Sequence, residues 1–378
     1  MLMLAAIVVA TDVSLHIQKG LDLREPCLEA DVPVINMSAL IHGPWDAQAV
    51  VARELVEAGR NGSAGFFTIV GHGMESSMEL MHQVADDFFR WPAADKLKLA
   101  PQQFNSENRH RFRGYAPATV NGKELLDWSN PAFSHAGYMK LHLARHNATD
   151  VSDLASREFL HEPMPCPADR PELCIALAAH WERMQALGEK VLRGFAIGLG
   201  HAAGRGDADA DYFDRAMRVG EPMSCLRFNF YPVVSADGTP VRTSKIDHQK
   251  AGLACEEHRD MTLITLLDQG DVGGLQIFQD DQWKDVPVTP GALVVNIGGG
   301  IQRWTNDALV ASTHRVRLVD SQRISIPFFL EAAYDTPMDC LPSTVSASRP
   351  CAHKATTYGP YIQGTFKLFK EYASRMES

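Results

Sequence analysis

Two side chains that can bind a metal lie two residues apart in the stretch Cys255–Leu267, which reads CEEHRDMTLITLL. His258 and Asp260 stand at the head of a run of Thr, Leu and Ile that predicts a buried strand. Because alternate side chains of a strand point to the same face, we expect the imidazole and the carboxylate to converge. The pair predicts a metal site, although a motif this short also arises by chance in ordinary polar strand residues.

A third candidate ligand, His314, lies far downstream in a second strand-like run, Ser312–Val316, which we expect to meet the first strand across a sheet. Two imidazoles and one carboxylate leave about three positions of an octahedral ferrous ion open, as in non-haem iron oxygenases. Zinc hydrolases use a helical His-Glu-x-x-His motif, which this chain lacks. The set therefore predicts Fe(II) rather than zinc.

A possible anion socket follows the third ligand. Arg323 and Ser325 share one face of a predicted strand by the period of two. A buried Arg beside a hydroxyl can bind a carboxylate through two hydrogen bonds. The alternative is a structural ion pair between Arg323 and an unrelated acid.

The composition is that of a soluble globular protein: 378 residues, of which 45% are hydrophobic and 22% charged. A net charge of -10 argues against nucleic acid as a partner. The apolar start, MLMLAAIVVA, is too short to span a bilayer and lacks a basic flank, so we expect no membrane association. The seven cysteines form no Cys-x-x-Cys pair, which predicts neither a zinc knuckle nor a disulfide framework and favours the cytoplasm.

The N-terminal half alternates helical and strand patterns. Strands are predicted at Asp31–Ile35 and Gly65–Val70, and helices at Trp45–Ala58, Ser76–Phe89 and Glu172–Leu199. The polar stretches Pro101–Asn130 and His146–Pro171 lack periodicity and are expected to be loops.

The C-terminal half is dominated by short strand patterns separated by Gly, Pro, Asp and Asn, which favours a sandwich or barrel. A closing helix is expected over Gly364–Met376. The predicted strands are Ser224–Tyr231, Leu263–Leu267, Leu275–Phe278, Gln282–Val286, Leu293–Ile297, Ser312–Leu318 and Ile324–Leu330.

The chain resembles the non-haem iron dioxygenases related to isopenicillin N synthase, which include the plant 2-oxoglutarate-dependent enzymes. The resemblance is carried by His-x-Asp, a distal His and Arg-x-Ser, and by the stretches VPVI, GFFTIVGHG, RFNFYP, VGGLQIF, WKDVPVTPGALVVNIG, THRV and RISIPFFLE. It implies an α+β fold with a mainly β core, a double-stranded β-helix or jelly roll, beside an N-terminal α/β region and a long supporting helix. The expected parts are an extension at 1–30, the α/β region at 31–200 and the core at 201–378, integrated into one unit.

The resemblance also implies the cofactors. Fe(II) is bound by His258, Asp260 and His314, and O2 is the oxidant. In members that use 2-oxoglutarate, its distal carboxylate pairs with the residues matched by Arg323 and Ser325. Asn229 and Tyr231, in RFNFYP, match the Asn-x-Tyr of the plant oxoglutarate enzymes, which favours this cosubstrate.

Two alternatives remain open: an isopenicillin N synthase-like oxidase that uses Fe(II) and O2 without 2-oxoglutarate, and a non-catalytic binding protein on the same fold. The substrate is expected to be a small molecule, anionic or aromatic. The loop at 101–130 either contacts this substrate or is a solvent-exposed loop without that role. Neither the substrate nor the oligomeric state follows from the sequence. The candidate substrate residues are Arg111, Arg113, Tyr115, Lys123 and Trp128.

Four further residues are of types that bind metals but are not expected to be ligands here. Cys255 stands three positions before His258, so strand alternation points it away from the metal and predicts a packing role. His72, His248 and His353 are expected to be surface or loop residues.

Overall fold

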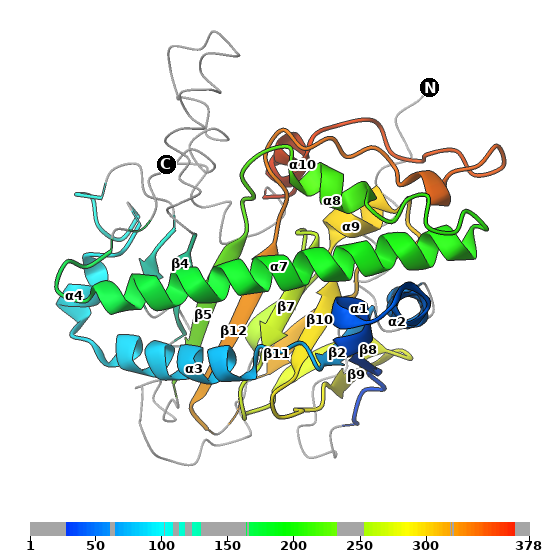
Figure 1. Cartoon of the computed structure of the whole chain (residues 1–378). Helices are drawn as coiled ribbons and strands as arrows, with labels where there is room; N and C mark the ends of the chain where they lie inside the picture. Colours follow the sequence, from blue (N-terminus) through cyan, green and yellow to red (C-terminus); the bar gives the residue numbers. More distant parts are fainter. Residues whose placement is uncertain are drawn as a thin grey trace, which may run out of the picture.

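Two β-sheets that face each other form the centre of the molecule. The computed structural model describes residues 28–60, 65–101, 103–108, 113–117, 123–129, 164, 166–232, 253–317, 319 and 321–366. One sheet has eight strands and the other four, and helices cross the larger one (Figure 1). The jelly roll and the α+β class that the sequence predicts are confirmed.

The larger sheet has the order β1-β2-β10-β7-β12-β5-β4-β3, and the smaller one β6-β11-β8-β9. The strands of the larger sheet are β1 (Val34–Asn36), β2 (Phe66–Val70), β10 (Leu293–Ile297), β7 (Ile264–Asp268), β12 (Arg323–Leu330), β5 (Cys225–Tyr231), β4 (Glu124–Trp128) and β3 (Tyr115–Ala116). Those of the smaller sheet are β6 (Leu253–His258), β11 (His314–Arg317), β8 (Leu275–Gln279) and β9 (Gln282–Asp285).

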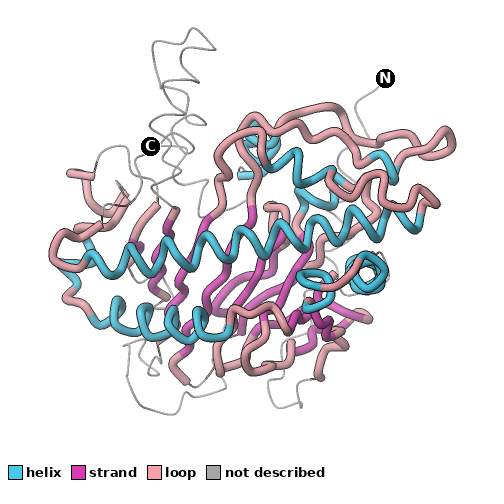
Figure 2. Tube along the Cα trace, viewed as in Figure 1, coloured by secondary structure: helices cyan, strands magenta, loops and turns pink. Residues whose placement is uncertain are grey.

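The helices gather on one side of the larger sheet, where Figure 2 shows the longest of them running across the strands. In the described part of the chain, no helix is long and apolar enough to cross a bilayer. The helices are α1 (Ser38–His42), α2 (Trp45–Gly59), α3 (Glu75–Arg90), α4 (Ala93–Leu97), α7 (Pro171–Ala202), α8 (Tyr212–Met217), α9 (Gly299–Trp304) and α10 (Tyr358–Phe366), with a 3₁₀ turn at Pro342–Thr344.

Strand alternation gives the larger sheet two different faces. In β5, Leu226 and Phe228 are buried in the main core together with residues of α7 and α3. Tyr231, of opposite parity, packs instead with residues of the smaller sheet such as Leu275 and Val316. The odd-numbered side chains of β5 therefore face the space between the sheets, where a ligand can bind.

The long helix α7 supports the outer face of the larger sheet, as predicted. A close contact with α2 requires a glycine, because a Cβ at Gly198 would come within 2.3 Å of the carbonyl oxygen of Ala52. At the other end of the helix, the indole Nε1 of Trp181 donates to the carbonyl of Ser224, 3.1 Å away, just before β5. The helix thereby fixes the start of a strand that carries candidate site residues.

The N-terminal strands extend the sheet at both edges. Strand β2 pairs with β1 and with β10, while β4 pairs with β3 and with β5. Strands drawn from 31–130 are thus hydrogen-bonded directly to strands of the C-terminal half.

Most predicted helices and strands agree with the structure to within one to three residues at each end. The loop expected across Pro101–Asn130 is wrong in part, because β3 and β4 lie inside it. Their pairing with β5 is long-range, so no local periodicity reports it. The closing helix begins earlier than expected, at Tyr358, and residues 367–378 lie outside the described part of the chain, as does most of His146–Pro171.

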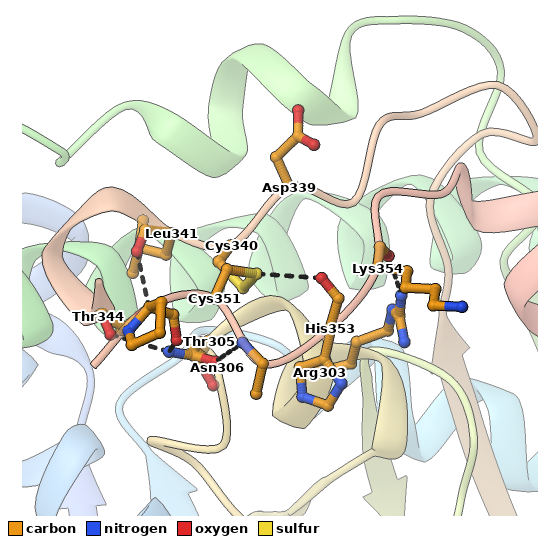
Figure 3. The surroundings of a disulfide bond; sticks show 12 residues. Arg303, Thr305, Asn306, Asp339, Cys340, Leu341, Thr344, Cys351, His353 and Lys354 are labelled. Carbon is orange, nitrogen blue, oxygen red and sulfur yellow. Dashed lines mark hydrogen bonds between the residues drawn. A yellow bond between two sulfur atoms is a disulfide. The ribbon is translucent and has the colours of Figure 1, made fainter. Parts of the chain in front are cut away.

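The prediction that the cysteines form no disulfides is wrong. Cys166 pairs with Cys174, and Cys340 with Cys351 (Figure 3), with Cα atoms 5.8 Å and 5.9 Å apart. Disulfide formation depends on the distance between Cα atoms, which irregular spacing along the sequence does not reveal. The cysteine content therefore no longer favours a reducing compartment.

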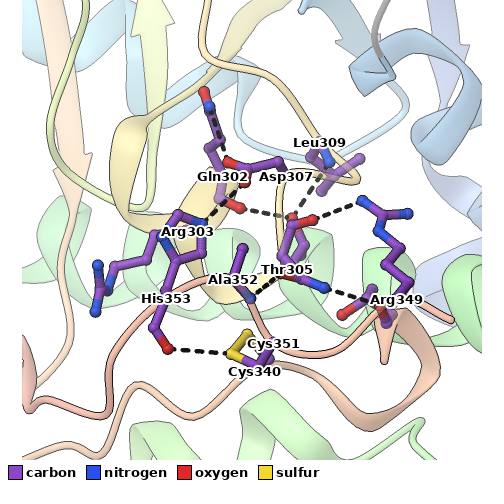
Figure 4. Close-up of polar contacts among 12 residues, drawn as sticks. Gln302, Arg303, Thr305, Asp307, Leu309, Cys340, Arg349, Cys351, Ala352 and His353 are labelled. Carbon is purple, nitrogen blue, oxygen red and sulfur yellow. Dashed lines mark hydrogen bonds and ion pairs between the residues drawn. A yellow bond between two sulfur atoms is a disulfide. The ribbon is translucent and has the colours of Figure 1, made fainter. Parts of the chain in front are cut away.

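The Cys340–Cys351 loop binds α9 and the turn after it. Asn306, in a left-handed conformation, donates from Nδ2 to the carbonyls of Thr344 and Pro350 and accepts from the backbone of Ala352. His353 lies 3.0 Å from a carboxylate oxygen of Asp307 (Figure 4). These contacts hold the helix that leads away from strand β10.

We predict that Cys340→Ser lowers the free energy of unfolding of the oxidised protein by about 2–3 kcal/mol, because it opens a short covalent loop. Equilibrium denaturation of the variant and of the unchanged protein measures the difference. In a thiol reductant the two proteins should unfold alike. Free thiols at both Cys340 and Cys351 in protein purified without reductant would contradict the assignment.

Candidate metal centre

Three side chains in the described part of the chain have the spacing of a metal site. His258 ends β6, His314 begins β11, and the two are direct cross-strand partners. Asp260 follows two residues after β6. Its Oδ1 atom lies 3.5 Å from Nε2 of His258 and 3.8 Å from Nε2 of His314. All three donor atoms fall within 4.8 Å of one another, so a single ion can contact them together.

The two ligands of the His-x-Asp motif converge for a different reason from the predicted one. His258 and Asp260 do not share a strand that continues through TLITLL, because β6 ends at His258 and β7 begins at Ile264. Between them the chain crosses from the smaller sheet to the larger one. The convergence therefore depends on how the two sheets face each other.

Asp260 is oriented by the larger sheet. Its Oδ2 atom accepts hydrogen bonds from Oγ1 of Thr265 in β7 and from Nδ2 of Asn296 in β10. Its carbonyl accepts from the backbone of Gly299, 2.7 Å away, at the start of α9. Because Oδ2 is occupied by these bonds, Oδ1 is left facing the two imidazoles.

Both imidazoles are oriented through their Nδ1 atoms. Nδ1 of His258 lies 2.8 Å from the carbonyl oxygen of Glu256, and Nδ1 of His314 lies 3.2 Å from that of Ser312. A carbonyl only accepts, so each Nδ1 donates a proton and each Nε2 is the nitrogen that a metal can bind. The edge of the Phe66 ring packs against His314, with centroids 5.3 Å apart.

In the metal-free protein, burial and mutual contacts shift the pKa of each of the three ligand side chains. Burial would raise the pKa of Asp260, but His314, His258 and the Thr265 hydroxyl hold it well below its usual value. Burial lowers the pKa of His314 to about 4, so this imidazole is neutral near pH 7. For His258, burial alone would lower the pKa, but hydrogen bonds to Asp260 and Cys255 raise it to about 11. Metal binding must displace that proton.

Cys255 packs against the apolar cluster between the sheets, as predicted, but the prediction that strand alternation turns it away from His258 is wrong. Its Sγ atom is 3.9 Å from Nδ1 of His258. The register between β6 and β11 shifts here, so that three residues from Cys255 to His258 match the two from Val316 to His314. Such a bulge breaks the alternation of side chains.

His72 and His353 are not part of this group of ligands. His72 is in a loop as predicted, but it is buried, and Nδ1 accepts a hydrogen bond from the backbone of Met74. His353 is bound to Asp307. His248 lies outside the described residues.

A second group of side chains gathers on the same face of the larger sheet. Arg323 and Ser325 in β12 are the register partners of Tyr231 and Asn229 in β5. Nη1 of Arg323 donates to Oγ of Ser325 over 3.1 Å, and its Cζ lies 5.0 Å from the centroid of the Tyr231 ring. Nδ2 of Asn229 lies 3.5 Å from the same Oγ. Strand pairing thus brings the four predicted residues together.

The Arg323 guanidinium is buried, with only 2% of the residue exposed. In the described part of the chain it donates to the Val272 carbonyl, 3.0 Å away, and to the Ser325 hydroxyl, and it also hydrogen-bonds the Tyr231 side chain; these three groups are neutral. Burial lowers its pKa accordingly. Oδ1 of Asn229 is also buried without a partner among the described residues. An uncompensated buried cation is costly, so this pocket suits an incoming anion.

Two of the candidate substrate residues lie on the opposite face of the larger sheet from the metal ligands. Tyr115 and Trp128 are 3% and 1% exposed and pack in the helix-covered core. The hydroxyl of Tyr115 donates to Glu124, 2.5 Å away. The prediction that these two side chains contact the substrate is therefore corrected, because Tyr115 in β3 and Trp128 in β4 both face the helix-covered core.

The other candidates have different positions. Arg111 lies outside the described residues. Lys123 precedes β4, with Nζ 5.4 Å from the centroid of the Tyr231 ring. Arg113 donates to the hydroxyl of Ser129 and, over 3.0 Å, to the carbonyl of Met223. Those bonds tie the Arg113 segment to the start of β5.

A buried acid lies beside Arg113. Glu331, directly after β12, is 5% exposed, and its Oε1 atom is 3.6 Å from Nη2 of Arg113. Burial raises the pKa of Glu331 to about 7, against the opposing attraction of Arg113. The carboxyl is therefore close to half protonated at neutral pH.

We predict a pH dependence of stability from Glu331. Because its pKa is higher in the folded protein than the ordinary 4.5, its stabilising contribution is complete below pH 4.5 and is lost as the pH rises through about 7. Glu331→Gln should remove up to about 3 kcal/mol of the fall in unfolding free energy between pH 5 and 8. Denaturation curves across that range test this, with the exposed Glu54→Gln as control. An identical pH profile for Glu331→Gln and the unchanged protein would refute it.

Sequence reasoning did not identify Thr265 and Asn296, the two side chains that hold Asp260. Both are buried polar residues within apolar strands, at 3% exposure each. A lone amide in the run LVVNI is a signal that points to a specific hydrogen-bond partner. It does not say which partner.

We predict that Thr265→Val weakens metal binding about tenfold, since loss of a hydrogen bond to a ligating carboxylate typically costs 10–100-fold in affinity. Anaerobic calorimetric titration with Fe(II) or Mn(II) measures the change. Thr68→Val, in the nearby strand β2, is the matched control. Equal affinities for Thr265→Val and the unchanged protein would show that this bond does not support the site.

The comparisons with known proteins agree with this geometry. Residues 222–332 match the model of the 2OG-Fe(II) oxygenase superfamily, and residues 32–162 match the N-terminal region of the non-haem dioxygenases in morphine synthesis. Isopenicillin N synthase of Streptomyces griseus is 29% identical over 343 residues, which cover 89% of this chain and 95% of that protein. That of Lysobacter lactamgenus is 29% identical over 338 residues, covering 88% and 95%.

Solved structures share the fold. A full-length Neurospora crassa protein crystallised with alpha-KG has a TM-score of 0.67 at 23% identity and covers 89% of this chain and 98% of its own. The rice dioxygenase for auxin oxidation has a TM-score of 0.61 at 22% identity, covering 89% and 96%. JOX2, in complex with 2OG, Fe and JA, has a TM-score of 0.61 at 23% identity, covering 94% and 92%.

A jelly roll that carries two histidines and an aspartate at one point is the structure of a non-haem iron oxygenase. The chain belongs to the Fe(II)/2-oxoglutarate oxygenase superfamily.

Proposed function

We propose that the protein is an Fe(II)- and 2-oxoglutarate-dependent oxygenase that oxidises a small-molecule metabolite by hydroxylation, desaturation or ring formation. In the hydroxylation case, 2-oxoglutarate, O2 and the substrate C–H group become succinate, CO2 and an alcohol. The proposal rests on the buried Arg323, whose acceptors in the described part of the chain carry no charge.

The three ligands fit iron. His258, Asp260 and His314 offer two imidazole nitrogens and one carboxylate oxygen, the donor set of non-haem ferrous sites. When bound, Fe(II) supplies the redox chemistry by which O2 oxidises the substrate. The protein's part is to orient the donors, through Thr265 and Asn296 on the carboxylate and through backbone carbonyls on both imidazoles.

The pocket around Arg323 fits the distal carboxylate of 2-oxoglutarate. The guanidinium supplies the charge, and the hydroxyls of Ser325 and Tyr231 are further donors that can point to the same anion. The Asn229 amide lies at the same place and has an unsatisfied atom among the described residues. Burial of this pocket excludes water, so each hydrogen bond to the carboxylate is stronger than it would be at the surface.

A second candidate function is an oxidase that uses Fe(II) and O2 without 2-oxoglutarate. The similarity to isopenicillin N synthases over 89% of the chain favours it. In such an enzyme Arg323 would bind a carboxylate of the substrate itself. Against it, Asn229 and Tyr231 lie beside Arg323, as the Asn-x-Tyr motif of the plant oxoglutarate enzymes predicts.

The substrate is proposed to be a small molecule rather than a polymer. The structural relatives include proteins crystallised with thymine and with JA. Arg113 lies beside Glu331, and Arg227 binds Asp127. Neither arginine is therefore proposed as the partner of an anionic substrate.

We predict that Arg323→Leu raises the dissociation constant of 2-oxoglutarate roughly 100-fold or more, because it removes one partner of a buried charged pair. Succinate formation should fall in parallel. The assay is anaerobic titration of the Fe(II) protein with 2-oxoglutarate, followed by quantification of succinate under O2. The exposed Arg90→Leu is the charge-matched control, and Asp260→Ala gives the background without a complete metal site.

Two results would sink the proposal. If the unchanged protein forms no succinate with any substrate while consuming O2, the oxidase takes its place. If Asp260→Ala leaves metal binding and turnover unchanged, the site is not the catalytic centre.

A further inference from the structure

Lys123 is the one candidate substrate residue that the described part of the chain places beside the anion pocket. It directly precedes β4, whose register pairs Glu124 with Phe230 and Leu125 with Asn229. Extended by one residue, this register sets Lys123 opposite Tyr231, which in turn pairs with Arg323. Lys123, Tyr231 and Arg323 therefore form one row across three neighbouring strands.

The aromatic ring of Tyr231 stands between two cations. Nζ of Lys123 is 5.4 Å from its centroid, and Cζ of Arg323 is 5.0 Å from it. Both approaches fall within the range of a cation–π contact. The two charges are therefore separated by about one Debye length at 0.1 M salt, which is about 10 Å. At lower salt each charge interacts with the other and with the same bound anion.

No carboxylate of the described strand β4 neutralises this row. Glu124 has the opposite parity on β4, and Oε2 lies 2.6 Å from Nζ of Lys96 on the helix-covered side. Asp127 has the same parity as Lys123 but lies four residues along and binds Arg227 through both oxygens. Two positive charges beside one ring repel each other. A bound anion offsets this repulsion, because both charges attract it.

The row lies toward the end of β12 opposite to the residue that pairs with Thr265. Thr265, which holds Asp260, pairs with Phe329 across β7 and β12. Phe329 and Arg323 lie near opposite ends of β12. A group bound at this end is therefore the far end of a ligand and not the carbon that is oxidised.

We propose that Lys123 is a positioning residue for 2-oxoglutarate, which it attracts through space while it holds the Tyr231 ring against Arg323; this rests on the proposed function. Lys123 is partly exposed, so its charge acts through solvent and is screened by salt, unlike the buried charge of Arg323. It adds attraction for the dianion without entering its hydrogen-bonded socket. This role replaces the contact with the oxidised substrate that the sequence suggested for Lys123.

The test is the dissociation constant of 2-oxoglutarate, measured anaerobically by calorimetry on the protein loaded with redox-inert Mn(II), over a series of NaCl concentrations. Lys123→Met keeps the length of the side chain and removes its charge. We expect it to weaken binding about threefold to tenfold at low salt and to flatten the salt dependence, as loss of one screened charge requires. Lys123→Arg should bind as the unchanged protein does.

The control is Lys190→Met on the exposed side of α7, which removes the same charge far from the pocket and should leave both quantities unchanged. Equal affinity and equal salt dependence for Lys123→Met and the unchanged protein would overturn the inference. So would an effect confined to the KM of the oxidised substrate. Absence of any 2-oxoglutarate binding by the unchanged protein would instead overturn the proposed function.

Discussion

Asp260 is held by side chains of the larger sheet, whereas both histidines come from the smaller one, and the site exists only while the two sheets keep their separation and register. Thr265 and Asn296 bind one carboxylate oxygen, and the other faces the imidazoles. Because β6 ends at His258 and β7 begins soon after Asp260, the chain crosses between the sheets at this point. The packing between the two sheets therefore also holds the metal ligands in position.

A second constraint is the cost of burying Arg323. The described residues of the strand pair β5–β12 provide neutral acceptors and an aromatic ring, but no carboxylate. The same sheet does supply an acid to its other inner-face arginine, since Asp127 binds Arg227. Leaving one guanidinium without an acid while pairing the other distinguishes a binding site from ordinary stabilisation.

The parity of the strands decides which side chains can meet a ligand. In β3, β4 and β5, one set of positions packs under α3 and α7, and the other faces the smaller sheet. Tyr115 and Trp128 fall in the first set, although their residue types suit a substrate pocket. Residue type and loop position are thus weaker guides than the face of the sheet, which depends on pairing between distant segments.

The sequence by itself determined the residue types of the metal site, the Arg-x-Ser and Asn-x-Tyr pairs and most helices and strands, because these depend on local periodicity and on motifs with fixed spacing. Only the tertiary structure decided that β3 and β4 add to the larger sheet, that Cys340 meets Cys351, and that Cys255 turns toward His258. Each of these is a long-range contact or a break in strand register. Such features follow from the distance between segments in space, which local sequence does not encode.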